Sequence, residues 1–244
     1  VRVFELGRVF LRDASVANTD TTVEGFHQPM RVAGVAYGAN DVLQWGRKEQ
    51  GIDFFDVKGD VEAMLAPLRA TFEPGTHPAM HPGRCARVLM NGKLIGHVGE
   101  LHPQWRQSWE LPLAPVLFEL ELDSVLQRAV PQFKAVAKHQ AVERDLAIVV
   151  AERVTHSEVM AAVESAVPAS LLRSAVLFDV YRPKAVRPGE EHAAGGAVAA
   201  GEKSLAVRLT LGRDEASLTE AEIEAAVQAV VTQLVARTGG RLRV

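Results

Sequence analysis

The hydrophobic pattern of residues 141 to 244 restricts the fold of this chain more than any other feature of its sequence. Alternating apolar residues predict strands, and apolar residues three or four positions apart predict helices. The predicted elements, in chain order, are a strand at 146–150, a helix from Thr155 to the residue before Pro168, strands at 176–181 and 205–211, a helix between Thr219 and Gly239, and a short strand at 241–244. This half of the chain therefore has the order βαββαβ.

Both predicted helices carry their own start signals. Thr155 and Glu158 have the spacing of a capping box, and so do Thr219 and Glu222. In such a box each side chain bonds the backbone N–H of the other residue. The βαββαβ order is that of the ferredoxin-like split unit. Its two helices cover one face of the sheet, so we expect the other face to be free for a partner.

Residues 1 to about 125 also combine strands with a helix. The strongest signal is Asn91-Gly92 between two apolar runs, because this dipeptide accepts the positive φ of a two-residue hairpin turn. Further strands are predicted at 31–37 and 116–122, and a helix at 56–69. Strands joined by hairpins favour an antiparallel sheet over a doubly wound parallel one. The predicted fold class is α+β.

The organisation along the chain follows from these two patterns. Residues 126–140 mix Arg, Lys, Pro and Ala without a clear period, so we place a linker there between domains at 1–125 and 141–244. The Ala- and Gly-rich stretch at 187–201 is predicted to be a flexible loop. The chain starts with Val in what reads as the middle of a strand, which predicts a piece of a longer protein.

Composition excludes several classes of protein. The single cysteine, Cys85, excludes a disulfide framework. No apolar run approaches the roughly 18 residues of a membrane span, and no secretory leader is visible. We therefore expect a cytoplasmic protein without a membrane partner. The net charge of −3 gives no attraction of the whole chain to nucleic acid, so any RNA binding has to use a local patch.

Catalytic and metal sites find little support. His77, His81 and Cys85 are four residues apart, which resembles a set of metal ligands and would suit a metal hydrolase. Prolines at 78 and 82 forbid the regular helix that would align them, and two imidazoles with one thiol form an incomplete site. We interpret this stretch as a loop before a strand. We expect no catalytic residue and no metal site in the chain.

The helix-free face of the predicted ferredoxin-like sheet is the better candidate. Strand alternation places Asp179 and Tyr181 on this face, and Val176, Phe178 and Val180 on the other. The same alternation adds residues from the two neighbouring strands, namely Ser204, Arg208, Arg241 and Arg243. An exposed aromatic ring among guanidinium groups suits the stacking of an unpaired base with phosphate contacts around it. A solvated sheet face with one stray tyrosine would show the same pattern.

Ordered motifs carry a resemblance to a known family. Four segments of the second half, Glu143–Ala147, Leu177–Arg182, Gly201–Leu209 and Leu218–Ile223, resemble the ferredoxin-fold anticodon-binding domain of the bacterial phenylalanyl-tRNA synthetase β subunit. Upstream, Phe4–Phe10, Asp53–Gly59 and His81–Arg84 resemble the catalytic-like module of that subunit. The resemblance covers essentially all 244 residues.

This resemblance implies a function for each domain. The family enzyme is a class II aminoacyl-tRNA synthetase, an α2β2 heterotetramer that uses ATP and Mg²⁺ to attach phenylalanine to tRNA-Phe. The catalytic-like module would pair with the α subunit and has no active site, while the last domain would contact the anticodon. Tyr181 would stack on an anticodon base and Ser204 would lie beside it. Further candidates for RNA contacts are Asp179, Arg182, Lys203 and Arg208.

Two points stay open from the sequence. The family pattern has a glycine after the arginine of the Tyr-Arg pair and a short loop, whereas Pro183 follows Arg182 here and the loop carries an insertion. In the alternative interpretation the chain is a protein-interaction module, whose open sheet face docks on a partner subunit without contacting RNA.

Overall fold

The computed structural model describes residues 1–128, 130, 133, 137–183 and 198–243. The chain divides into two compact units, Val1–Gln132 and Phe133–Val244. Most of the predicted loop at 187–201 and part of the predicted linker at 126–140 lie outside the described residues.

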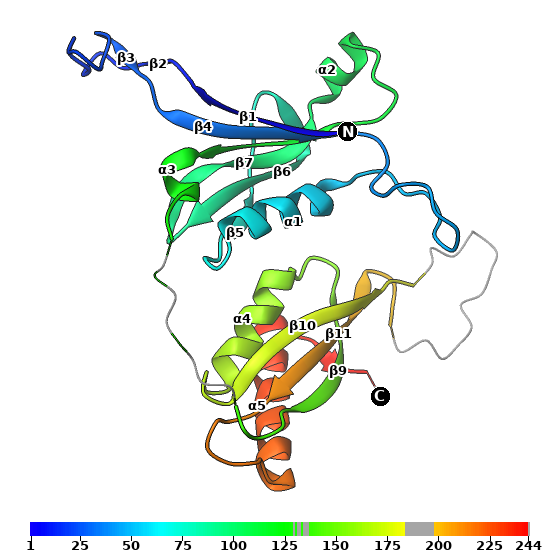
Figure 1. Ribbon diagram of the computed structural model, residues 1–244. Helices are drawn as coiled ribbons and strands as arrows, with labels where there is room; N and C mark the ends of the chain where they lie inside the picture. Colours follow the sequence, from blue (N-terminus) through cyan, green and yellow to red (C-terminus); the bar gives the residue numbers. More distant parts are fainter. Residues whose placement is uncertain (129, 131–132, 134–136, 184–197, 244) are drawn as a thin grey trace, which may run out of the picture. The chain divides into compact units, whose positions relative to one another are not determined.

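The first unit is built on a six-stranded antiparallel sheet with the strand order β1-β4-β8-β7-β6-β5 (Figure 1). Its strands are β1 (Arg2–Arg8), β4 (Met30–Ala36), β5 (Thr71–Pro74), β6 (Met80–Met90), β7 (Lys93–Leu101) and β8 (Val116–Glu121). A small ribbon pairs β2 (Leu11–Arg12) with β3 (Phe26–His27). The helices are α1 (Phe54–Leu65), α2 (Pro103–Ser108) and α3 (Leu122–Val125).

Helix α1 covers one face of this sheet. It begins at a capping box in which Asp53 accepts from the backbone of Asp56 and Asp56 accepts from that of Asp53. Val57, Val61 and Leu65 are fully buried and pack into the apolar core of the sheet. The predicted helix at 56–69 ends earlier than expected, at Leu65, because Pro67 drives the residue before it into the extended region.

The hairpin predicted at Asn91-Gly92 joins β6 to β7. Asn91 has φ 51° and Gly92 has φ 78°, which is the pair of positive values that a two-residue turn of this kind requires. In the middle of β7, Gly96 approaches β8 so closely that a Cβ atom would lie 1.9 Å from the carbonyl oxygen of Glu119.

The second unit is a four-stranded antiparallel sheet with the order β10-β11-β9-β12 and two helices. The elements are β9 (Val142–Ala151), α4 (His156–Ala166), β10 (Leu172–Tyr181), β11 (Glu202–Leu211), α5 (Glu220–Thr238) and β12 (Arg241–Leu242). Both helices begin at the capping boxes seen in the sequence, and α5 ends at Gly239 with φ 66°. The predicted α+β class and the βαββαβ order are confirmed.

Helices α4 and α5 pack on the same face of this sheet (Figure 1). Val159 and Val163 of α4 meet Val230 and Leu234 of α5 in one buried cluster. The sheet contributes to it through its helix-facing positions, Ile148, Val150, Leu205, Val207, Leu209 and Leu211. The opposite face of the sheet carries no helix among the described residues.

In the part of the chain that the structure describes, no helix has the length and apolar character needed to cross a membrane.

Candidate nucleic-acid interface

We call the helix-free side of the second sheet the open face. The strand register determines which of its residues lie side by side. Tyr181 of β10 lies opposite Ser204 of β11, Ser204 lies opposite Val149 of β9, and Val149 lies opposite Arg241 of β12. Residues directly opposite in antiparallel strands point to the same side of the sheet. These four residues therefore form one row across the open face.

Tyr181 stands at the outer end of that row. Its side chain is 46% exposed, and the guanidinium of Arg243 lies 5.1 Å from the centroid of its ring. The backbone N–H of Arg243 donates to the carbonyl oxygen of Ala147 at 2.8 Å, which fixes the chain after β12 on the neighbouring strand. Tyr181 thus presents a partly exposed ring with a cation over it.

The structure corrects the predicted faces of β10. Leu177 lies opposite Val207 and Asp179 lies opposite Ala206, so Phe178 is an extra residue in a β-bulge. Alternation is reset at this bulge. Asp179 and Tyr181 lie on the open face as predicted, and Val180 lies opposite the buried Leu205 on the helix side.

The prediction was wrong for the residues before the bulge. Val176 lies opposite Arg208 on the open face and is 54% exposed, while Leu177 packs against the core. Phe178 is 52% exposed, and the guanidinium of Arg208 lies 5.3 Å from the centroid of its ring. The open face therefore carries a second aromatic ring, which simple alternation had assigned to the core side.

Arg208 is held by two carboxylates of β9. Its Nε and Nη2 donate to the two oxygens of Asp145 at 2.8 Å each, and its Nη1 lies 3.3 Å from a Glu143 oxygen. Hydrogen bonds from Arg208 lower the pKa of the Asp145 carboxyl, and the same contacts raise the pKa of the guanidinium. The charge proposed from sequence for RNA contact is thus balanced within the sheet.

Arg182 and Lys203 meet at Glu152. The Nε of Arg182 donates to a Glu152 carboxylate oxygen at 2.9 Å. The ammonium of the buried Lys203 donates to the Glu152 backbone carbonyl at 2.7 Å, and it lies 3.9 Å from the carboxylate. These two predicted RNA-contacting residues share one anionic partner.

Arg241 is paired in the same way. Its guanidinium donates to both carboxylate oxygens of Glu202, at 2.5 and 2.7 Å. These bonds, with one from the backbone N–H of Ala199, lower the pKa of Glu202 to about 2. Acidic partners such as Glu152 and Glu202 were missed by the sequence prediction, since they lie far along the chain from the bases they neutralise.

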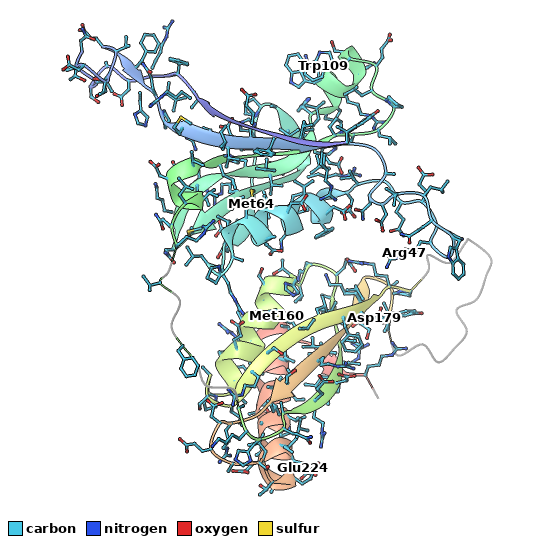
Figure 2. All side chains as sticks on the ribbon, viewed as in Figure 1. Arg47, Met64, Trp109, Met160, Asp179 and Glu224 are labelled. Carbon is cyan, nitrogen blue, oxygen red and sulfur yellow. The ribbon has the colours of Figure 1, made fainter. Side chains whose placement is uncertain are left out.

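Ser204 and Asp179 differ in access. Ser204 is only 4% exposed, although it lies on the open face beside Tyr181, whereas Asp179 is exposed (Figure 2). Only a small part of Ser204 is therefore accessible to a partner. Asp179 can be reached directly.

The chemistry of the open face is that of flat rings with locally balanced charges. Two half-exposed aromatic rings each have a guanidinium over them. Arg182, Arg208 and Arg241 are paired with carboxylates of the same unit, which reduces the net positive field. Aromatic rings and guanidinium planes both stack on unpaired nucleobases. The face therefore suits base stacking better than it suits a purely electrostatic grip on phosphate.

The His77–Cys85 stretch of the first unit does not gather a metal site. His77 makes a ring contact with His97 at 5.2 Å, and the buried Cys85 thiol donates to the Met80 sulfur at 3.6 Å. Burial raises the pKa of that thiol. Among the described residues, no three His, Cys, Asp or Glu side chains come together in a way that could hold a metal ion.

Comparison with known families places both units. Residues 137–243 match the ferredoxin-fold anticodon binding domain, which is the class that the second sheet and its open face define. Residues 1–122 match the CLM domain of the phenylalanyl tRNA synthetase beta chain. The chain therefore belongs to the phenylalanyl-tRNA synthetase β-chain family, and the resemblance seen in the motifs is confirmed.

Curated relatives agree over the whole length of the chain. Phenylalanine–tRNA ligase β subunits of Ralstonia nicotianae and Cupriavidus pinatubonensis are each 46% identical over 247 aligned residues, and that of Chromobacterium violaceum is 42% identical over 244. Each alignment covers 100% of this chain but only 28 to 30% of the relative. The chain thus spans less than a third of the relatives' length.

Proposed function

We propose that this chain is the part of a phenylalanine–tRNA ligase β subunit that binds the anticodon region of tRNA-Phe and helps to assemble the α2β2 enzyme. The observation that carries the proposal is the half-exposed Tyr181 ring on the open face of a sheet that belongs to an anticodon-binding family. Tyr181 stacks on an anticodon base. Ser204 and Asp179 make polar contacts beside it.

The first unit has the role of a pairing surface for the α subunit. Its edge strand β1 supports this role, because Val3, Phe4 and Leu6 are all more than half exposed there. Exposed apolar surface of this extent marks an interaction site in soluble proteins. In this proposal ATP and Mg²⁺ act in the complete ligase and no residue of this chain is catalytic. The enzyme works in the cytoplasm.

The basic residues predicted from sequence have a more limited role. Arg182, Lys203 and Arg208 are committed to carboxylates or a carbonyl of the same unit. They support the sheet and its rings, and they reach phosphate only by exchanging those partners. Stacking on rings, rather than a basic stripe, is the main source of affinity in this proposal.

The test is Tyr181→Ala in the complete ligase. Loss of one stacked base costs roughly 1–3 kcal/mol, so kcat/KM for tRNA-Phe should fall between about fivefold and about 150-fold. Tyr181→Phe keeps the ring and serves as the matched control. The measurement is aminoacylation of tRNA-Phe and of a variant with a replaced anticodon.

The outcome separates the proposal from a protein-docking role. If Tyr181→Ala reduces the difference in kcat/KM between tRNA-Phe and the tRNA with a replaced anticodon, the open face contributes to anticodon discrimination. If the discrimination is unchanged while the α2β2 assembly weakens, the open face is a protein interface and the proposal is wrong.

A further inference from the structure

Phe178 has no role in the core of the second unit. The bulge pushes it out of the alternating pattern, and its neighbours Ala175 and Leu177 provide the packing against the helices. More than half of its side chain remains exposed. The Phe178 ring therefore adds little to the core and is accessible to a partner on the open face.

Two aromatic rings of the open face are each covered by a guanidinium group. Tyr181 lies under Arg243 and Phe178 lies under Arg208, with ring-to-guanidinium distances of 5.1 and 5.3 Å. The second pair is the more rigid, because Asp145 and Glu143 hold the guanidinium of Arg208. A ring whose covering cation is fixed forms a preorganised flat layer.

The spacing of the two rings fits consecutive bases. Tyr181 and Phe178 are three residues apart on β10, which corresponds to about 10 Å along an extended strand. Sheets that recognise single-stranded RNA use aromatic residues to stack two or three unstacked bases. A nucleotide chain that places one base on Tyr181 passes Phe178 within one or two further nucleotides.

We propose that Phe178 is a second base-stacking residue of the open face. An unpaired nucleobase next to the one on Tyr181 stacks on the layer formed by the Phe178 ring and the Arg208 guanidinium. The inference rests on the proposed function, since it assigns a second contact to the same RNA loop. It also gives the β-bulge a purpose, because without the extra residue Phe178 and Tyr181, which are three positions apart, would lie on opposite faces of the sheet.

The experiment uses the complete ligase and a tRNA-Phe anticodon stem-loop with 2-aminopurine placed at each loop position in turn. Stacking on an aromatic ring quenches the fluorescence of this base analogue. Phe178→Leu keeps the apolar bulk and removes the ring. Val176→Ala is the matched control, because Val176 is an exposed, non-aromatic residue of the same face opposite the same Arg208.

The expected result is position-specific. Tyr181→Ala should restore fluorescence at one loop position and Phe178→Leu at a neighbouring one, with affinity reduced about fivefold or more in each. Val176→Ala should change affinity less than twofold. Phe178→Trp, which keeps a flat ring, should retain the quenching, and thermal unfolding confirms that each variant is folded.

Two outcomes overturn the inference, and they are distinguishable. If Tyr181→Ala acts and Phe178→Leu leaves every position quenched, Phe178 stacks no base while the proposed function stands. If neither variant changes fluorescence or affinity, the open face does not bind the loop, and both the inference and the proposed function are wrong.

Discussion

The guanidinium of Arg243 lies 5.1 Å from the centre of the Tyr181 ring, so the aromatic group proposed to receive a base already carries a cation. A cation–π contact at an exposed site is worth only about 0.5–1 kcal/mol. A stacked base is worth roughly 1–3 kcal/mol. The base therefore has enough free energy to displace the guanidinium, which is then free to meet a phosphate of the same nucleotide chain.

This exchange predicts the salt dependence of an Arg243→Ala variant. The plot of log affinity against log salt concentration should lose about 0.7 of its slope, the contribution of one phosphate contact in single-stranded nucleic acid. Arg243→Lys keeps the charge and should keep the slope. The measurement is stem-loop binding by the complete ligase at several salt concentrations, and an unchanged slope in Arg243→Ala would contradict the exchange.

Asp145 neutralises part of the positive charge of Arg208 on the open face. Asp145→Asn should therefore increase RNA affinity at low salt. The substitution removes the carboxylate that binds Arg208 most closely, leaves Glu143 as its anionic partner, and keeps an amide of similar shape. We expect a few-fold tighter binding of any stem-loop, with less discrimination between anticodons, because phosphate contacts carry no sequence information.

The control for Asp145→Asn is Glu224→Gln, which makes the same change of charge on the exposed surface of α5 (Figure 2). Because α5 packs on the helix side of the sheet, this variant should bind RNA as the unmodified enzyme does. Equal effects of the two substitutions would show that net charge alone, rather than the release of Arg208, sets the affinity.

The capping box of α5 predicts an acid-sensitive component of stability. Hydrogen bonds from the backbone and hydroxyl of Thr219, with the contact to Arg213, lower the pKa of Glu222 to about 2 from the ordinary 4.5. A carboxyl with a depressed pKa in the folded state stabilises the fold fully above pH 4.5, and this contribution is lost as the pH falls towards 2.

Glu222→Gln keeps a residue suited to the capping box and removes the titrating group. The thermal midpoint of this chain should then fall less steeply between pH 5 and about pH 2 than it does with Glu222 in place. The measurement is circular dichroism at 222 nm during heating at a series of pH values. If the thermal midpoint of the variant falls as steeply with pH as that of the original chain, Glu222 does not contribute to the acid sensitivity of the fold.

We expect the substitution Gly96→Ala to destabilise the first unit strongly. A Cβ atom there would lie 1.9 Å from the Glu119 carbonyl oxygen, so Gly96→Ala forces β7 and β8 apart in the middle of the sheet. Overpacking of this kind typically costs about 1–3 kcal/mol. Urea unfolding of the chain measures the loss in the free energy of unfolding.

Gly59→Ala is the matched control for that substitution. Gly59 lies inside α1 and a Cβ atom there meets nothing within 4 Å. Because alanine favours a helix interior over glycine by about 0.5–1 kcal/mol, this variant should be slightly more stable than the original chain. Two alanine substitutions with effects of opposite sign would show that the close approach, not the loss of a glycine, causes the first effect.

Much of the fold was predictable because its signals are local. The boxes Thr155–Glu158 and Thr219–Glu222 start helices through bonds that span three residues, and Asn91-Gly92 turns a hairpin through its own backbone. The family motifs lie on the same elements.

The composition of the open face was predicted only in part. Tyr181 and Ser204 lie side by side in one row, as alternation indicated, but alternation fails for Phe178 because pairing with β11 inserts a bulge there. No count of apolar residues along one strand reveals a bulge, since it is defined by two strands together. The burial of Ser204 likewise depends on side chains from other strands.

The sequence by itself determined the order of the elements, their starts and stops, the family and the place of Tyr181. Only the tertiary structure decided which charged side chains pair with one another. Arg208 meets Asp145 across 63 residues of chain, and Arg241 meets Glu202 across 39. Local patterns specify local hydrogen bonds, but the partners of a charged group are chosen by strand pairing, which brings distant segments together only in the folded chain.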